Sequence, residues 1–184
     1  MEIFKTAIPA EFEKYANDCL KGREGCVIHI GNTPCVWTGA LRNTFNKEEC
    51  VKRGLYIGQG QYLGGTIVCF PGDVSICHSS FQKEGFAEKL CSAVKEWFKS
   101  LGYALAFDEN DFLLGGKKVF SWGRATAVSG ITQTVAHFSV NLDISIVSAI
   151  CTKPMIKTPG SLSVYGICSD DIINGIDFDN IVNG

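Results

Sequence analysis

Apolar side chains recur at helical spacing along two stretches of the chain, which predicts two amphipathic helices. The first covers residues 9–21, begins with a proline and is closed by Gly22. The second begins at Phe86, and its apolar stripe continues to Leu101 before Gly102 ends it. This second stripe is the strongest in the sequence, so we expect the helix to cover one face of a sheet.

Short runs rich in β-branched and aromatic residues predict the strands of that sheet. Turn residues between them indicate hairpins across Gly31–Pro34, across Pro71–Gly72 and across Gly115–Gly116. The predicted strands are residues 26–30, 35–39, 55–58, 66–70, 73–80, 103–107, 111–114, 118–128 and 132–142.

Three shorter helices are expected at residues 46–53, at 143–150 and near 169–174, within a tail that is otherwise irregular. No internal repeat or long linker divides the chain. The pattern therefore predicts one α/β (α+β) domain over residues 1–184, in which helices pack on a mixed, mainly antiparallel sheet.

Composition narrows the classes of function. The chain is 46% hydrophobic and 20% charged, with a net charge of −2, so it has the profile of a packed globular protein. It has no run of Lys or Arg that could follow a nucleic-acid backbone. It also has no apolar stretch long enough to span a bilayer and no secretion signal at its start. We expect a cytoplasmic protein that binds neither nucleic acid nor membrane.

The nine cysteines also indicate a cytoplasmic protein. Their number is odd, they form no C-x-x-C pair, and most lie among apolar residues. We therefore expect reduced, buried thiols in a reducing compartment, with no disulfide framework and no cysteine metal site.

Two segments carry candidate chemistry. Residues 58–65 contain four glycines, which allow a backbone to approach a ligand closely, although a tight structural connection explains them equally well. Residues 110–119, NDFLLGGKKV, place Lys117 and Lys118 after a Gly-Gly turn. A lysine that points into a cleft can hold an acyl carbonyl and a phosphate together, whereas a solvated turn lysine is the plainer alternative.

Taken in order, four segments resemble the lipoate and biotin protein ligase superfamily over nearly the whole chain. The first, VIHIGNTPCVWTGALRNTFNKEECVKRG, is similar to the stretch where a glycine-bearing hairpin leads to a short helix. The others are LGGTIVCFPGD, similar to the lipoyl-binding strand and turn; NDFLLGGKKV, similar to the N-D-x-x-x-x-G-K-K-[IV] signature; and VAHFSVNLD, similar to the strand that closes the site.

The resemblance implies a biotin/lipoate ligase catalytic-domain fold and an acyltransferase activity. In this family a lipoyl, octanoyl or biotinyl acid is activated with ATP and Mg²⁺ to an acyl-adenylate, and the acyl group passes to a lysine of a lipoyl or biotinyl carrier domain. Lys118 would be the catalytic lysine. The implied substrate-binding residues are its neighbour Lys117, Asn110 and Asp111 on the nucleotide side, Gly64, Gly65 and Thr66 against the acyl chain, and Asn141 on the closing strand.

The sequence departs from the family pattern at several positions. The arginines that precede the glycines in family members are absent here, and Phe120 and Trp122 stand where small residues leave space for the ligand. Family octanoyltransferases use a lysine and a cysteine without ATP, and Cys151 lies near the position of that cysteine. The alternative to a ligase-like enzyme is a non-catalytic protein of this fold within a larger assembly. Of the histidines, only His137 lies near the inferred pocket.

Overall fold

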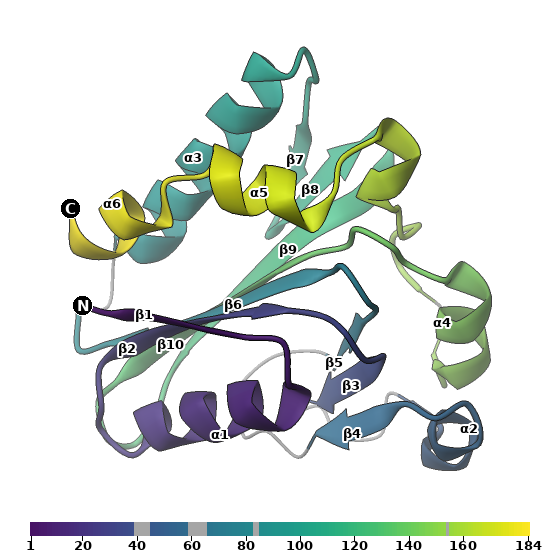
Figure 1. Cartoon of the computed structure of the whole chain (residues 1–184), viewed down its shortest axis with the longest axis horizontal. Coiled ribbons are helices and arrows are strands. Elements are labelled where there is room, and N and C mark those ends of the chain that lie inside the picture. The colour runs from purple at the N-terminus through teal and green to yellow at the C-terminus, as the bar shows by residue number, and fades with distance from the viewer. Residues whose placement is uncertain (39–44, 59–65, 83–84, 154) are drawn as a thin grey trace.

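Two β-sheets form the framework of the protein in a computed structural model, which describes residues 1–38, 45–58, 66–82, 85–153 and 155–184 (Figure 1). The seven-stranded sheet has the order β1-β2-β6-β10-β9-β8-β7 and is antiparallel except where β1 pairs with β2. Its strands are β1 (Ile3–Thr6), β2 (Gly25–Ile30), β6 (Val74–Ser80), β7 (Ala106–Asp108), β8 (Asp111–Leu114), β9 (Lys117–Thr126) and β10 (Thr132–Phe138). The three-stranded sheet, order β4-β3-β5, contains β3 (Cys35–Thr38), β4 (Tyr56–Gly58) and β5 (Thr66–Cys69).

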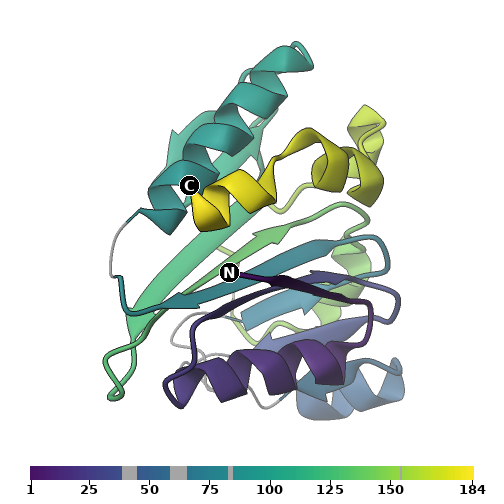
Figure 2. The ribbon, with the colours of Figure 1, turned by 60° about the vertical axis from the view of Figure 1, so that its left-hand side comes forward.

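Helices cover both faces of the large sheet. The long helix α3 lies on one face together with the C-terminal helices, whereas α1 and the small sheet lie on the other (Figures 1 and 2). The helices are α1 (Pro9–Leu20), α2 (Lys47–Lys52), α3 (Phe86–Ser100), α4 (Ile144–Ile150), α5 (Ser169–Gly175) and α6 (Phe178–Asn183), with a 3₁₀ helix at Leu162–Tyr165. This arrangement confirms the expected mixed, mainly antiparallel α/β architecture.

The main core lies between the large sheet and α3. Leu90, Val94 and Phe98 of α3 are fully buried against strand residues such as Ile28 and Phe120. Burial of each such side chain contributes about 1.5–3 kcal/mol relative to exposure, so this interface stabilises the fold substantially. A second cluster joins α1 to the small sheet, and a third joins the small sheet to α2 and α4.

Two of the three predicted hairpins are wrong, and so is the single sheet. The strands on either side of Gly31–Pro34 are β2 and β3, which belong to different sheets. The strands around Pro71–Gly72 are β5 and β6, which are separated in the same way. Each turn therefore carries the chain from one sheet to the other, and the two turns meet, because Gly72 N donates to Gly31 O at 2.7 Å.

The third hairpin is confirmed. Strands β8 and β9 pair in antiparallel register through Gly115 and Gly116, whose φ angles of 58° and 76° suit the left-handed region that a two-residue hairpin turn requires. The sequence pattern did not predict β1 or α6, and it placed a strand at 103–107 where β7 covers only Ala106–Asp108. Within the described residues, no helix is both long and apolar enough to cross a bilayer.

Candidate active site

A pocket of about 440 Å³ opens between the two sheets. Most of its polar side chains come from the β7–β10 part of the large sheet, and most of its apolar side chains come from β5, from α4 and from the segment after α4. The polar lining is Thr66, Glu109, Asp111, Lys118, Ser121, His137, Ser139, Lys153 and Lys157. The remaining lining is Ile67, Val68, Leu142, Val147, Cys151, Met155, Ile156 and Pro159. The side of the pocket formed by the large sheet thus offers groups for a charged ligand atom, and the side chains from β5 and α4 offer apolar contacts for an aliphatic chain.

An irregularity in β9 places Lys118 in this pocket. In the β8–β9 ladder Phe112 pairs with Phe120 but Leu113 pairs with Lys118, so Val119 is the extra residue of a β-bulge. Side chains alternate between the faces of a regular strand, and one extra residue brings Lys118 and Ser121 to the same face. The Lys118 Nζ atom lies 3.8 Å from Asp111 Oδ1, and its side chain is 37% exposed.

A row of polar residues crosses the same face of the large sheet. The strand registers align His29 with Ser75, Ser75 with His137, His137 with Ser121, and Ser121 with Asp111. The row therefore runs through five adjacent strands from β2 to β8. The opposite face of these strands carries the apolar side chains that pack against α3.

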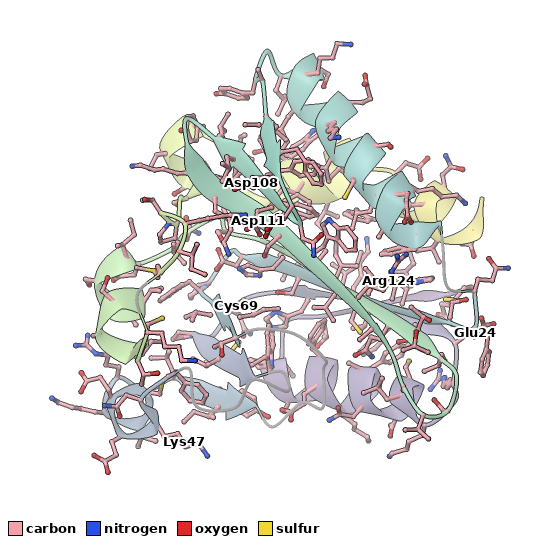
Figure 3. The ribbon with its side chains drawn as sticks, turned by 180° about the vertical axis from the view of Figure 1, so that it is seen from behind. Glu24, Lys47, Cys69, Asp108, Asp111 and Arg124 are labelled. Carbon is pink, nitrogen blue, oxygen red and sulfur yellow. The ribbon has the colours of Figure 1, made fainter. Side chains whose placement is uncertain are left out.

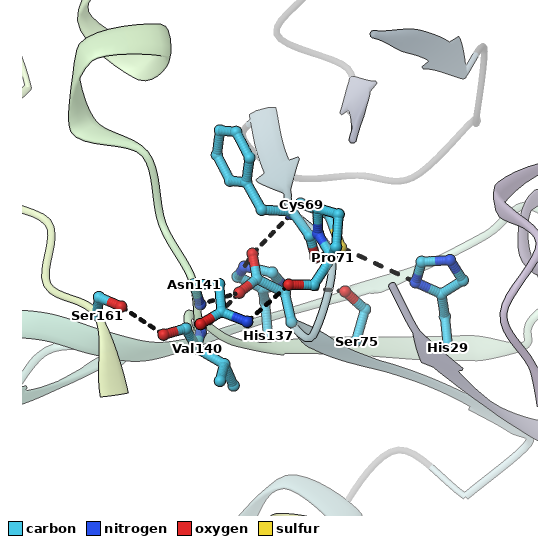
Figure 4. Close-up of polar contacts among 10 residues, drawn as sticks. His29, Cys69, Pro71, Ser75, His137, Val140, Asn141 and Ser161 are labelled. Carbon is cyan, nitrogen blue, oxygen red and sulfur yellow. Dashed lines mark hydrogen bonds and ion pairs between the residues drawn. The ribbon is translucent and has the colours of Figure 1, made fainter. Parts of the chain in front are cut away.

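His137 lies at the centre of this row and is 5% exposed. Its Nδ1 atom is 2.9 Å from Ser75 Oγ, a hydrogen-bond distance, and its Nε2 atom is buried without a hydrogen bond in the described part of the chain (Figure 4). Burial, with smaller contributions from Lys118 and His29, lowers the pKa of His137 to about 3. At neutral pH the imidazole is uncharged, so its 3.7 Å approach to Asp73 is not an ion pair.

Asp73 fixes the turn beside the pocket. Its carboxylate is fully buried and accepts hydrogen bonds from the backbone N–H groups of Phe70, Val140 and Asn141, at 2.6–2.9 Å. Burial raises the pKa of Asp73 to about 6, although the three donors act in the opposite direction. The carboxylate therefore joins the turn after β5 to the end of β10.

The residues implied by the family resemblance do not all meet at the pocket. Thr66, Asp111 and Lys118 line it. Lys117 is exposed and Asn110 is not among the lining residues, although Asn110 O accepts a hydrogen bond from Trp122 N at 3.0 Å. Asn141 is also outside the lining and donates instead to Pro71 O at 2.8 Å (Figure 4). The predicted Gly64 and Gly65 lie outside the described residues.

The bulky residues Phe120 and Trp122 of β9, which stand where family members have small residues, do not fill the pocket. Phe120 is buried in the core beside α3, and Trp122 packs against that same core. Only Ser121 between them faces the pocket. Arg124 is directed away as well, because its guanidinium lies 3.3 Å from the Glu88 carboxylate of α3. Figure 3 shows Arg124 far along the sheet from Asp108 and Asp111.

Lysines supply the positive charge of the pocket lining. Lys118 projects from β9, while Lys153 and Lys157 come from the segment after α4. Sequence reasoning missed the last two, since they are more than 30 positions from Lys118 and belong to no recognisable motif. Cys151 also lines the pocket; burial raises the pKa of its thiol. The described residues contain no group of three or more His, Cys, Asp or Glu side chains that could hold a metal ion.

Comparison with solved structures identifies the fold as that of lipoate and biotin protein ligase catalytic domains. No protein-family model matches the sequence, and no curated protein is significantly similar to it. Sequence identity to the solved structures is low, so the likeness concerns the fold alone.

Three of these structures illustrate the match. The bipartite lipoate protein ligase of Thermoplasma acidophilum, studied with its E2 lipoyl domain, has a TM-score of 0.72 and 16% identity, with 94% of this chain and 78% of that chain covered. A lipoate-protein ligase A bound with ATP has a TM-score of 0.71 and 15% identity, with coverages of 95% and 81%. The biotin protein ligase of Aquifex aeolicus has a TM-score of 0.51 and 8% identity, with coverages of 98% and 67%.

Proposed function

We propose that the protein is an acyltransferase of the lipoate-ligase type, which activates a carboxylic acid as an acyl-adenylate and passes the acyl group to a lysine of a carrier domain. The observation that carries this proposal is the position of Lys118, which lines a pocket that also has apolar residues of β5 and α4 in its lining. An ammonium group there would bind the carboxylate of an acid such as lipoate, octanoate or biotin while the aliphatic part contacts Ile67, Val147 and Met155.

The chain's own residues would orient the acid. Asp111, at 3.8 Å, holds the Lys118 ammonium on the pocket face of β9. The buried Nε2 atom of His137 has no hydrogen-bond partner among the described residues, so an acyl oxygen would give it one. The Ser75 hydroxyl, 2.9 Å from Nδ1, fixes the ring for that contact.

The pocket also fits a nucleotide phosphate in part. Lys118 and Lys153 would hold the phosphates of ATP, which supplies the leaving group that turns an unreactive acid into an adenylate. These lysines would take the part of the arginines that the sequence lacks, because they offset the charge that an adenylate concentrates. Magnesium would be supplied with the nucleotide as Mg-ATP.

Partner and substrate follow from the proposed chemistry. The acceptor would be the lysine of a lipoyl or biotinyl carrier domain. The T. acidophilum ligase whose fold this chain shares was studied together with such a lipoyl domain.

Calorimetric titration tests the proposal. Lipoic acid, octanoic acid and biotin are each titrated into the protein with and without Mg-ATP. We expect one of the acids to bind, and to bind more tightly when Mg-ATP is present. Absence of heat with every acid would instead favour the non-catalytic alternative, in which this fold serves only as a structural component.

A further inference from the structure

The ammonium group of Lys157 lies within the acidic turn that joins β7 to β8. It is 3.1 Å from Asp108 Oδ2, 2.9 Å from Asp111 Oδ2 and 4.0 Å from Glu109 Oε2. It also donates a hydrogen bond to the backbone carbonyl of Asp108 at 2.9 Å. The side chain is only 19% exposed, so these contacts are partly shielded from solvent.

The oxygen atoms around this ammonium resemble the surroundings of a bound hard cation. Two carboxylates and one carbonyl approach Nζ at 2.9–3.1 Å. Small divalent cations take oxygen ligands of the same kinds, often one or two carboxylates with water completing the shell. Without a positive charge at this place, the three carboxylates of the turn would repel one another and any anionic ligand in the pocket.

Lys157 also determines where Asp111 lies. One carboxylate oxygen of Asp111 faces Lys157 at 2.9 Å, and the other faces Lys118 at 3.8 Å. The segment that carries Lys157 is fixed to β9 by two backbone hydrogen bonds, from Lys118 N to Thr158 O and from Gly160 N to Lys118 O, both at 2.8 Å. The lysine, the segment and the Asp111–Lys118 pair therefore form one connected unit.

We propose that Lys157 is an internal cation, which occupies the place that a divalent metal ion would take between Asp108 and Asp111 and so positions Asp111 beside Lys118. This inference goes beyond the proposed function, because it concerns the charge balance of the pocket whichever ligand the pocket binds. It makes Lys157 a positioning residue. The acidic turn is then neutralised in part by a positive charge of the chain itself.

Manganese binding tests the proposal directly, without acid or nucleotide. Free Mn²⁺ is followed by electron paramagnetic resonance during titration of the unsubstituted protein and of Lys157→Met. With the ammonium removed, we expect Mn²⁺ to bind at least about tenfold more tightly than in the unsubstituted protein. A second substitution, Asp111→Asn, should abolish this gain.

Lys153→Met is the matched control, because it removes the same charge from the same pocket but not from the acidic turn. It should leave Mn²⁺ binding as it is in the unsubstituted protein. The proposal is overturned if Lys157→Met gains no Mn²⁺ binding, or if Lys153→Met gains as much. It is also overturned if the unsubstituted protein already binds Mn²⁺ with equal affinity through Asp111.

Amide hydrogen exchange supplies a second measurement. In Lys157→Met the amides of Lys118 and Gly160 should exchange faster than in the unsubstituted protein, and added Mn²⁺ should slow them again. If added Mn²⁺ leaves the exchange rates of these amides unchanged, the metal ion does not replace the Lys157 ammonium and the proposal is contradicted. If Lys157→Met does not fold, Lys157→Gln takes its place, because glutamine is uncharged but retains a hydrogen-bond donor for the Asp108 carbonyl. The same results for Mn²⁺ binding and amide exchange then support or overturn the proposal. None of these readouts depends on acyl transfer, so failure of the proposed enzyme activity leaves them unaffected.

Discussion

The Lys118 ammonium lies 3.8 Å from the Asp111 carboxylate, although the two residues pair with different partners in the β8–β9 ladder. The extra residue Val119 makes this possible, because it shifts the alternation of β9 so that both side chains face the small sheet. The bulge is therefore what converts an ordinary hairpin lysine into a pocket residue.

The first prediction concerns the two neighbouring lysines of that hairpin. Lys118→Ala should weaken binding of the acid by roughly tenfold to hundredfold, since hydrogen bonds to charged groups contribute about 1.5–3 kcal/mol. It should also abolish acyl transfer, while the free energy of unfolding changes by less than about 1 kcal/mol because Lys118 is partly exposed. Calorimetry measures acid binding, an acyl-transfer assay measures activity, and thermal melting measures stability.

Lys117→Ala is the control for that experiment, because Lys117 is exposed and does not line the pocket. It should bind the acid like the unsubstituted protein. Full activity of Lys118→Ala, or equal losses in the two variants, would remove Lys118 from the mechanism.

The second prediction is that stability falls as the pH drops from 7 to 5. Burial lowers the pKa of His29 and His78 to about 4 and that of His137 to about 3, from an ordinary value of 6.5. Below pH 6.5 the unfolded chain therefore binds protons that the folded chain does not. The contribution of the neutral histidines to the free energy of unfolding is thus present at neutral pH and is lost on acidification. Asp73 partly offsets this loss, because its pKa of about 6 means that the folded chain binds one proton there before the unfolded chain does.

With three histidines against one aspartate, we expect a loss of roughly 4 kcal/mol in the free energy of unfolding over that range. Urea denaturation at each pH measures it. In His78→Gln, a variant outside the pocket, the loss should be smaller by about 2 kcal/mol. An unchanged pH dependence in this variant would show that His78 is not held neutral by the fold.

The third prediction concerns Gly31, where the chain passes from the large sheet to the small one. A Cβ atom on Gly31 would lie 2.4 Å from the carbonyl oxygen of Phe70, which is backbone and cannot move aside easily. Gly31→Ala should therefore lower the free energy of unfolding by roughly 2–4 kcal/mol. Gly123→Ala is the control, since nothing lies within 4 Å of its added Cβ and its φ is not in the left-handed region. Similar melting temperatures for the two variants would contradict the crowding inferred at Gly31.

The fourth prediction separates a ligase from a cysteine-dependent acyltransferase. Burial raises the pKa of Cys151, so at neutral pH the group is a thiol, the less nucleophilic form. Cys151→Ala should leave acid binding and acyl transfer unchanged, and mass spectrometry should detect no acyl group on the unsubstituted protein after incubation with an acyl donor. A stable thioester at Cys151 would favour the octanoyltransferase chemistry instead.

The sequence predicted the helices and strands better than it predicted which strands pair with one another. The stripes around Phe12 and Leu90 identified α1 and α3, and the helix expected at residues 46–53 is α2, which the Asn46 side chain caps. Turn residues, however, describe only local geometry. The turns at Gly31 and Gly72 resemble hairpin turns, but long-range pairing of β2 with β6 and of β3 with β5 carries the strands into separate sheets.

The site could be predicted only where a motif marks it. Lys118 and Asp111 belong to one short segment, so a single hairpin brings them together. Lys157 reaches the same place through the path of the chain after α4, and no local pattern encodes that path. The neutral His137 and the polar row around it likewise depend on strand registers, which periodicity does not determine.

The uneven burial of the cysteines offers a practical handle. Of the nine, Cys168 is exposed, Cys91 and Cys151 are half-buried and the other six are buried. A maleimide fluorophore used in limiting amount should therefore react first at Cys168, just before α5, on the α3 side of the large sheet and away from the pocket. The native chain thus carries its own attachment point for an optical reporter of ligand binding, and no cysteine has to be removed to use it.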